Sequence, residues 1–385
     1  MTKETVASFS GKNKTFEVTG KKVLIFCNSL VGLLSFRKEL IEELKNNKYG
    51  VIVVAPQHEY ADDLKKLKCK YVPIEMDLRG TNPVKDLGLI KAFKKIVKNE
   101  KPDVVLTYTI KPNVYGGYVC GKLKIPYICN VTGLGTSVEK PGLLQKVTLF
   151  LYKKGLKKAK CVFFQNKDNL DFMKKHGVIR GKYELIPGSG VNLERHTLLD
   201  YPKDDTIRFL FIARIIKEKG IEDYLEIAKY IKGKYPNTEF HIAGPCDDEK
   251  YLPIIKDLEK KSIVVYHGPV KDVRELHKIS NCTIHPTFYP EGMSNVLLES
   301  CAAGRPIITT NRPGCKEIVD DGVNGYMFKC QDVETLKKKV DSFMKLSFEE
   351  KKKMGINGRK KVEKEFSRDI VVRAYLEAIG GANEL

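Results

Sequence analysis

The segment Glu291-Gly-Met-Ser-Asn-Val-Leu-Leu-Glu299 decides the fold class of this chain. It follows a loop with two prolines, His285-Pro-Thr-Phe-Tyr-Pro290, and precedes Ala302-Ala-Gly304-Arg-Pro-Ile-Ile-Thr309, which is typical of a helix stop followed by a buried strand. Open α/β sheets bind their ligands where a strand ends in a loop and a helix begins. The segment therefore predicts an α/β fold with a ligand site at the start of this helix.

Glu291 and Glu299 can hold a diphosphate between them. At about 1.5 Å of rise per residue, Glu299 lies about two turns into the helix, ~12 Å along its axis. Carboxylates accept hydrogen bonds and so suit the hydroxyls of a sugar and a ribose, while the helix N-terminus attracts phosphate. We therefore predict a nucleotide-sugar donor bound by Glu291, Gly292, Met293, Ser294, Asn295, Val296 and Glu299. The alternative is a surface helix with two solvated glutamates.

Length and composition indicate two domains and a cytoplasmic location. A chain of 385 residues exceeds one ordinary domain. It has 42% hydrophobic residues but no long uncharged apolar run, and residues 1–20 lack the apolar core of a signal peptide. The ten cysteines form no C-x-x-C pair and no Cys/His cluster at metal spacing. We expect buried free thiols, and neither disulfides nor structural zinc.

Positive charge is concentrated in the first half of the chain. Residues 1–200 contain 36 Lys and Arg against 19 Asp and Glu, whereas the remaining residues are nearly balanced. Such an asymmetry indicates an anionic partner of the first half. Nucleic acid, an anionic membrane and a diphosphate-bearing acceptor are the candidates.

Predicted buried strands and helices alternate along the chain, and this pattern is typical of doubly wound parallel sheets. We expect a flexible tail at 1–20, a Rossmann-like domain at 21–200, a second at 206–362, and a C-terminal helix at 363–385 that can return to the first domain. Two such domains predict a ligand site in the cleft between them. The expected strands are at 22–27, 51–55, 103–108, 126–130 and 161–165, then at 209–213, 239–243, 264–266, 282–284 and 306–309.

A second motif, Phe211-Ile-Ala-Arg214-Ile-Ile-Lys-Glu-Lys219-Gly220, follows a predicted strand. Together with the glutamate pair, it resembles the retaining GT-B glycosyltransferases of family 4, and the resemblance covers nearly the whole chain after the tail. It implies that Arg214 and Lys219 bind the donor diphosphate and that Glu291 positions the sugar, so these three form the expected catalytic group. It also implies donor contacts at Gly32, Gly244, Gly268 and Val270.

The first half carries Leu106-Thr-Tyr-Thr-Ile-Lys111-Pro-Asn113-Val-Tyr-Gly116 and Asn130-Val-Thr132-Gly133-Leu-Gly135. These segments resemble a bacterial subgroup that adds sugars, often N-acetylhexosamines, to undecaprenyl-diphosphate-linked acceptors. The first lacks the histidine that many family members have there, so no catalytic histidine is expected. The resemblance implies an acceptor side formed by Lys111, Asn113, Thr132, Gly133 and Gly135. The alternative is a surface lysine beside ordinary glycine turns.

The resemblance also implies how the reaction proceeds. The acceptor hydroxyl would attack from the face that the diphosphate leaves, and the leaving diphosphate would help to deprotonate it. Arg214, Lys219 and the helix amides would stabilise the charge that develops on the diphosphate. Because these groups are available and no Asp-x-Asp element is present, we expect neither a metal nor a cofactor beyond the UDP-sugar substrate.

Residues 143–160 combine leucines and aromatic side chains with six lysines. A helix of this kind can lie on an anionic membrane surface, where each lysine contributes ~1 kcal/mol. We therefore expect peripheral attachment to the inner face of the cell membrane. The alternative is an ordinary packed helix with a solvated basic face.

Three other functions compete with a glycosyltransferase. A nucleic-acid-binding protein would explain the charge, but the chain has no recognised nucleic-acid-binding signature, so we expect no nucleic acid partner. An NAD-dependent enzyme is disfavoured because no predicted strand is followed by G-x-G-x-x-G. A sugar-nucleotide epimerase or hydrolase of the same architecture is the third alternative, and it would act on the donor without an acceptor.

Overall fold

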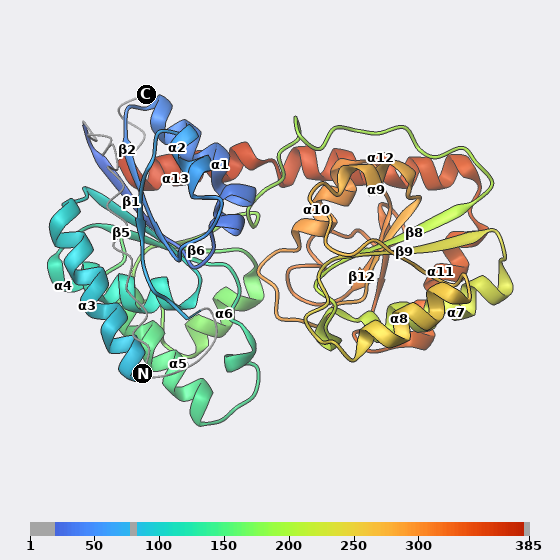
Figure 1. Cartoon of the computed structure of the whole chain (residues 1–385), viewed down its shortest axis with the longest axis horizontal. Coiled ribbons are helices and arrows are strands. Elements are labelled where there is room, and N and C mark those ends of the chain that lie inside the picture. The colour runs from blue at the N-terminus through green and yellow to red at the C-terminus, as the bar shows by residue number, and fades with distance from the viewer. Residues whose placement is uncertain (1–19, 78–82, 381–385) are drawn as a thin grey trace, which may run out of the picture.

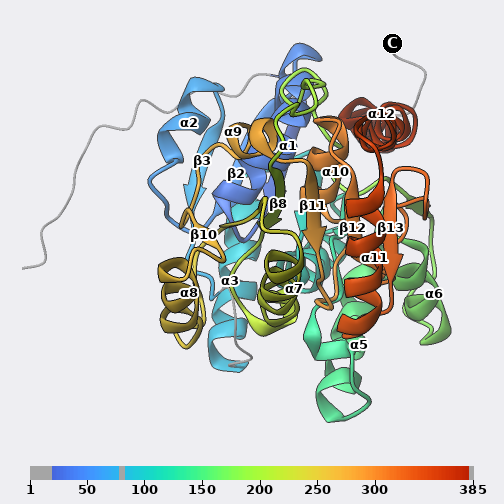
Figure 2. The ribbon, with the colours of Figure 1, turned by 90° about the vertical axis from the view of Figure 1, so that its right-hand side faces the viewer.

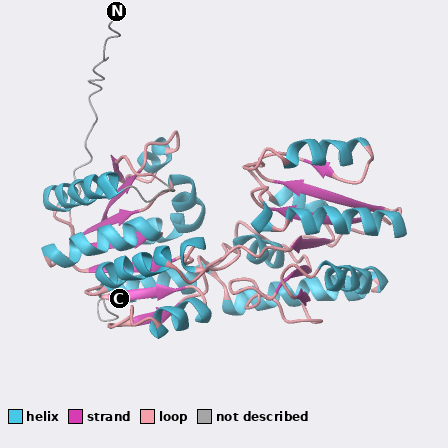
Figure 3. Ribbon diagram, turned by 90° about the horizontal axis from the view of Figure 1, so that it is seen from below, coloured by secondary structure: helices cyan, strands magenta, loops and turns pink. Residues whose placement is uncertain are grey.

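The computed structural model describes residues 20–77 and 83–380. It has two α/β lobes (Figures 1 and 3), each with a parallel sheet between helices, as the sequence predicts. The predicted tail at 1–20 lies outside the described residues, apart from Gly20.

The first domain has a seven-stranded sheet in the order β3-β2-β1-β4-β5-β6-β7. The strand order reverses between β1 and β4, so the loops after these two strands border a crevice at the carboxyl edge. Its strands are β1 (Lys22–Phe26), β2 (Gly50–Ala55), β3 (Lys70–Pro73), β4 (Val104–Tyr108), β5 (Tyr127–Val131), β6 (Cys161–Phe164) and β7 (Tyr183–Leu185). Its helices are α1 (Leu30–Asn46), α2 (Ala61–Lys66), α3 (Pro83–Glu100), the π-helix η1 (Pro112–Gly116), α4 (Gly117–Leu123), the short η2 (Thr136–Val138), α5 (Leu143–Leu156) and α6 (Lys167–Lys175).

The second domain has a six-stranded sheet in the order β10-β9-β8-β11-β12-β13, and here the order reverses between β8 and β11. Figure 2 looks onto this domain, with β10 and β13 at opposite edges. Its strands are β8 (Ile207–Ile212), β9 (Thr238–Ala243), β10 (Val265–Tyr266), β11 (Cys282–His285), β12 (Ile307–Thr310) and β13 (Gly325–Phe328). Its helices are the short η3 (Lys217–Lys219), α7 (Ile221–Lys234), α8 (Tyr251–Lys260), α9 (Arg274–Ile279), α10 (Asn295–Ala302), α11 (Val333–Lys345) and α12 (Phe348–Glu365).

The chain crosses twice between the domains. After α12, residues 366–367 lead back to the first domain, where α13 (Arg368–Gly380) packs beside α1 (Figure 1). Tyr375 of α13 is fully buried in the first domain, and its hydroxyl accepts a hydrogen bond from Asn130 Nδ2 at 2.7 Å. The last helix of the described chain is therefore part of the core of the first domain.

All ten cysteines lie within the described residues and are free, and eight of them are buried.

Within the described ranges, no helix combines the length and the apolar character that a membrane span requires.

Candidate functional site

The switch points of the two sheets face one another, and cavities lie between them. The Gly32 cavity, of about 240 Å³, is lined by Gly32 and Thr109 of the first domain and by Glu291 and Asn295 of the second. The Gly133 cavity, of about 220 Å³, shares Thr109 and Glu291 with it. The Arg214 cavity, of about 530 Å³, is lined by Arg214, Glu218 and Tyr289 on one side and by Asp86, Lys111 and Tyr115 on the other.

Lys219 and Glu291 form an ion pair beside these cavities, and both side chains are mostly buried. The loop after β11 packs on the turn after β8 because the carbonyl of Glu218 accepts hydrogen bonds from the amides of Phe288 and Tyr289, both at 2.9 Å. Gly220 permits this approach, since its φ is +79° and a Cβ there would lie 2.2 Å from the carbonyl oxygen of Pro286. The two motifs of the sequence thus meet across neighbouring strands.

Tyr289 lies between the two basic residues. The Nζ of Lys219 is 4.8 Å from the centre of its ring, and the Cζ of Arg214 is 5.8 Å from it. Arg214 also donates to Asp247 Oδ2 at 2.9 Å and keeps 32% of its side chain exposed. Two cations on one aromatic ring can reach neighbouring oxygens of a diphosphate. The sequence motif gave no sign of the roles of Tyr289 and Asp247.

The N-terminus of α10 is less open to an anion than the sequence suggests. The backbone amide of Ser294 donates to the carbonyl of Gly314 at 2.8 Å and is not available to phosphate. Met293 packs into an apolar cluster with Leu297, and the carbonyl of Val296 accepts from Ser300 Oγ at 2.7 Å. Asn295 lines the Gly32 cavity, and its Oδ1 is buried without a hydrogen-bond partner in the described structure. An unpaired buried oxygen facing a cavity suits a ligand with a hydrogen-bond donor.

Two glycines bring the domains into backbone contact at Glu291. A Cβ on Gly292 would lie 2.2 Å from the carbonyl oxygen of Thr132, and Gly133 adopts a φ of +137° directly opposite. Asn166 Nδ2 donates to the carbonyl of Gly292 at 2.6 Å and to that of Glu291 at 3.2 Å. The loop that carries Glu291 is therefore held by both domains.

On the expected acceptor side, Lys111 is held by an ion pair. Its Nζ lies 2.9 Å from Asp86 Oδ1, and the Tyr115 hydroxyl donates to Asp86 Oδ2 at 2.8 Å. Asp86 was not expected in the site, because only the three-dimensional packing of α3 against η1 brings it there. Thr132, Gly133 and Gly135 line the Gly133 cavity.

Two positions differ from the sequence-based expectation. Asn113 does not face the crevice: it is fully buried, accepts from Thr107 Oγ1 at 2.6 Å and donates to the carbonyl of Asn130 at 2.8 Å, so it joins β4, η1 and β5. Gly32 is expected in the loop between the first strand and the first helix, but it lies in the first turn of α1, because Ser29 caps the helix and accepts from the Gly32 amide at 3.1 Å.

The remaining predicted contacts lie farther along the second domain. Gly244 donates to the carbonyl of Gly268 at 2.8 Å, and it has no room for a side chain because a Cβ would lie 1.9 Å from Ala213 O. Val270 packs against the small apolar cluster that contains Ala243. These residues gather at the carboxyl ends of β9 and β10, next to the loop of Arg214.

Glu299 lies outside the three cavities described above, about one turn into α10, because the helix begins only at Asn295. Its Oε1 is 3.9 Å from His196 Nε2, and 21% of its side chain is exposed. Burial raises the pKa of Glu299 to about 7, although the positive charges of Arg368 and Arg195 oppose the shift. The carboxyl therefore changes charge near neutral pH.

This shift predicts how stability depends on pH. Between the ordinary pKa of 4.5 and the folded value of about 7, the folded chain keeps a proton that the unfolded chain releases. The contribution of Glu299 to the free energy of unfolding therefore falls as the pH rises through this window. The side chain of Glu299→Gln does not titrate, so this variant lacks the pH-dependent loss. We expect the free energy of unfolding of Glu299→Gln, minus that of wild type, to increase by on the order of 2 kcal/mol from pH 5 to pH 8. Urea unfolding at both pH values measures this, with the exposed Glu194→Gln as a control that should show no such change.

Comparison with known proteins agrees with this architecture. Residues 22–166 match the family described as Glycosyl transferase 4-like, and residues 200–361 match Glycosyl transferases group 1. The chain is 27% identical over 364 residues to the N,N'-diacetylbacillosaminyl-diphospho-undecaprenol alpha-1,3-N-acetylgalactosaminyltransferase of Campylobacter jejuni, covering 89% of this chain and 94% of that one. It is 24% identical to the UDP-Gal:alpha-D-GlcNAc-diphosphoundecaprenol alpha-1,3-galactosyltransferase of Escherichia coli, with 82% and 87% covered.

A solved glycosyltransferase structure from Rickettsia africae has the same fold. Its TM-score is 0.76 at 20% sequence identity, and the match covers 93% of this chain and 97% of that chain. The two family matches lie in different domains, one on each sheet. The chain therefore belongs to the glycosyl transferase 4-like and group 1 families and is a glycosyltransferase with the GT-B fold.

Proposed function

We propose that this glycosyltransferase moves a hexose or N-acetylhexosamine from a UDP-sugar to a saccharide linked to a polyprenyl diphosphate, with retention of anomeric configuration. The observation that carries the proposal is the grouping of Arg214, Lys219 and Glu291 around Tyr289, beside cavities lined by both domains. The names of the two relatives support the acceptor, and one of them also names UDP-Gal.

In this proposal the protein acts by positioning and electrostatics. Lys219 and Arg214 stabilise the negative charge on the leaving diphosphate, and Glu291 holds hydroxyls of the transferred sugar. Because two cations are present at this point, the leaving group needs no divalent metal. The Lys219–Glu291 pair keeps both groups in place before the donor binds.

The acceptor side is proposed to lie in the Arg214 cavity. Asp86 and Lys111 line its first-domain wall, where Asp86 fixes the position of the lysine charge. This wall continues into the Phe150 cavity, of about 690 Å³, because Val114, Tyr115 and Leu151 line both. A lipid-linked acceptor could thus extend from the reaction centre toward the surface of the first domain.

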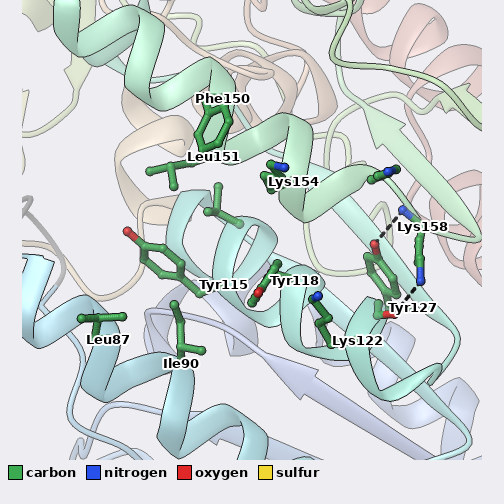
Figure 4. A pocket seen from close by; sticks show the side chains of 13 residues that line it. Leu87, Ile90, Tyr115, Tyr118, Lys122, Tyr127, Phe150, Leu151, Lys154 and Lys158 are labelled. Atoms are coloured by element: carbon green, nitrogen blue, oxygen red, sulfur yellow. Dashed lines mark hydrogen bonds between the residues drawn. The ribbon is translucent and has the colours of Figure 1, made fainter.

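The Phe150 cavity has the chemistry of a surface for anionic lipid (Figure 4). Leu87, Ile90, Phe150 and Leu151 line one part of it. Lysines 122, 154, 157 and 158 line another part, and none of them has a carboxylate partner among the residues that the structure describes. Helix α5 also exposes Leu143, Leu144, Val147 and Phe150, which are 46 to 79% accessible. We infer that this face binds the cytoplasmic leaflet, where apolar side chains insert and lysines attract anionic headgroups.

A variant that places negative charge on this face tests the membrane contact. We expect Leu144→Glu/Phe150→Glu to lower binding to phosphatidylcholine vesicles containing phosphatidylglycerol by roughly tenfold or more, because two apolar anchors become anionic. Vesicle co-sedimentation measures this. The variant Ile254→Glu/Val323→Glu, which adds the same charges at exposed apolar positions of the second domain, should bind like wild type. Equal binding by all three proteins would contradict the contact.

A donor panel with a polyprenyl-diphosphate-linked sugar acceptor, read by product mass, tests the transfer itself. The proposal predicts a product heavier by one sugar, α-linked from an α-linked donor, and formed equally in the presence of a metal chelator. Incubation with donor alone separates the alternative of an epimerase or hydrolase. Conversion of the donor at the same rate without acceptor would contradict the proposal.

A further inference from the structure

Arg37 is a buried cation without an anionic partner. It lies in α1, and only 4% of it is exposed. Its guanidinium stacks on Tyr108 and Tyr375, with Cζ 5.2 and 5.8 Å from the ring centres. Nη1 donates to the carbonyl of Phe36 at 2.9 Å, Nε has no partner, and no carboxylate of the described residues pairs with it. Such burial is costly unless a ligand supplies the missing negative charge.

Arg37 lines the Gly32 cavity, and unpaired polar atoms from both domains border the same cavity. Thr109 Oγ1 from the first domain and Asn295 Oδ1 from the second are buried without hydrogen-bond partners in the described structure. Thr109 also has a φ of +71°, an uncommon value for a residue other than glycine. Unsatisfied buried groups that converge on one cavity indicate a polar ligand in it.

The unpaired charge of Arg37 favours an anion in this cavity. Glu291 lines the same cavity and, under the proposed function, holds the transferred sugar. The group next to that sugar in a nucleotide-sugar is the β-phosphate, whereas the nucleoside would extend toward Gly244 and Gly268. We propose that Arg37 binds the β-phosphate of the donor. This inference rests on the proposed function and adds a donor contact from the first domain.

The consequence is that the donor bridges the two domains. Arg214 and Lys219 reach the diphosphate from the second domain, and Arg37 reaches it from the first. Because a nucleoside monophosphate lacks the β-phosphate, the contact with Arg37 should make the affinity for the nucleoside diphosphate higher than that for the monophosphate. A charge-assisted hydrogen bond of this kind is worth roughly 10- to 100-fold in affinity.

The test compares UDP and UMP binding by calorimetry in wild type and in Arg37→Met. We expect UDP affinity to fall roughly 10- to 100-fold in the variant, while UMP affinity stays unchanged. Arg37→Lys, which keeps the charge, should retain part of the preference for UDP. Arg373→Met, which removes an exposed arginine on α13, serves as the control and should behave like wild type.

A stability measurement distinguishes binding from a structural role. Removing a buried cation that has no anionic partner should leave the thermal midpoint of the ligand-free protein equal or higher, whereas a structural arginine would lower it. Equal UDP affinity in wild type and Arg37→Met would overturn the inference, as would an equal loss for UDP and UMP. If Arg37→Met unfolds, the affinity of Arg37→Lys decides, since a structural role predicts unchanged selectivity between UDP and UMP. Failure of wild type to bind UDP would instead refute the proposed function.

Discussion

Replacement of Lys219 by alanine is expected to lower kcat for sugar transfer roughly 100- to 1,000-fold. In the proposed mechanism the substitution removes a cation from the leaving diphosphate, and it leaves the Glu291 carboxylate without its ion-pair partner. Both effects raise the energy of the transition state, where negative charge builds on the diphosphate. Product formation at saturating donor and acceptor measures the loss.

Glu291→Ala should lose most transfer as well, because no carboxylate then positions the transferred sugar.

The neighbouring Lys217 provides the matched control. It lies on the same short helix, is 56% exposed, and is 3.7 Å from Glu222, away from the cavities. Lys217→Ala should therefore turn over at nearly the wild-type rate. Circular dichroism should show that Lys219→Ala keeps its fold, since the lysine is the last residue of the short helix η3 and its side chain is not part of the hydrophobic core of the second domain. Near-normal turnover by Lys219→Ala would remove this residue from the site.

Replacement of Gly292 by alanine is expected to lower transfer about 100-fold or more. A methyl group there would lie 2.2 Å from the backbone oxygen of Thr132 and 2.4 Å from Gln165 Oε1. The glutamine can move, but the backbone of the facing loop cannot do so without separating the domains. A displacement of about 1 Å at a reacting centre costs on the order of 100-fold in rate. The initial rate of transfer, together with far-ultraviolet circular dichroism, measures the effect.

Gly233 serves as the control for this substitution. It lies in α7, and nothing is within 4 Å of the position that its Cβ would occupy. Gly233→Ala should be active and slightly more stable, because alanine favours a helix by about 1 kcal/mol relative to glycine. Wild-type activity in Gly292→Ala would show that the domains need not approach as closely as they do here.

The sequence was sufficient to predict the fold because each domain repeats a local pattern. Buried strands alternate with helices, and parallel strands connected in this way form doubly wound sheets. The motif after β8 and the motif after β11 could also be expected to meet, since these two strands pair in one sheet. This adjacency brings Lys219 to Glu291, although the residues are 72 positions apart.

The rest of the site depends on packing that no local pattern encodes. Asp86 reaches Lys111 only because α3 packs against the π-helix, and Arg37 reaches the Gly32 cavity only because one face of α1 lines that cavity. Asn113 was misplaced for a related reason. Its side chain enters the core, where Thr107 and Asn130 satisfy it, and the sequence does not distinguish a buried amide from one that faces a ligand.

The position of α13 has a consequence for how the protein is made. Asn130 and the hydroxyl of Tyr375 are 245 residues apart in sequence but share a buried hydrogen bond. During synthesis, the strands of the first domain therefore emerge long before the helix that packs on Tyr108 and Phe163. Until α13 is made, these two aromatic side chains lack that cover, and the first domain cannot complete its core before the second domain has been synthesised.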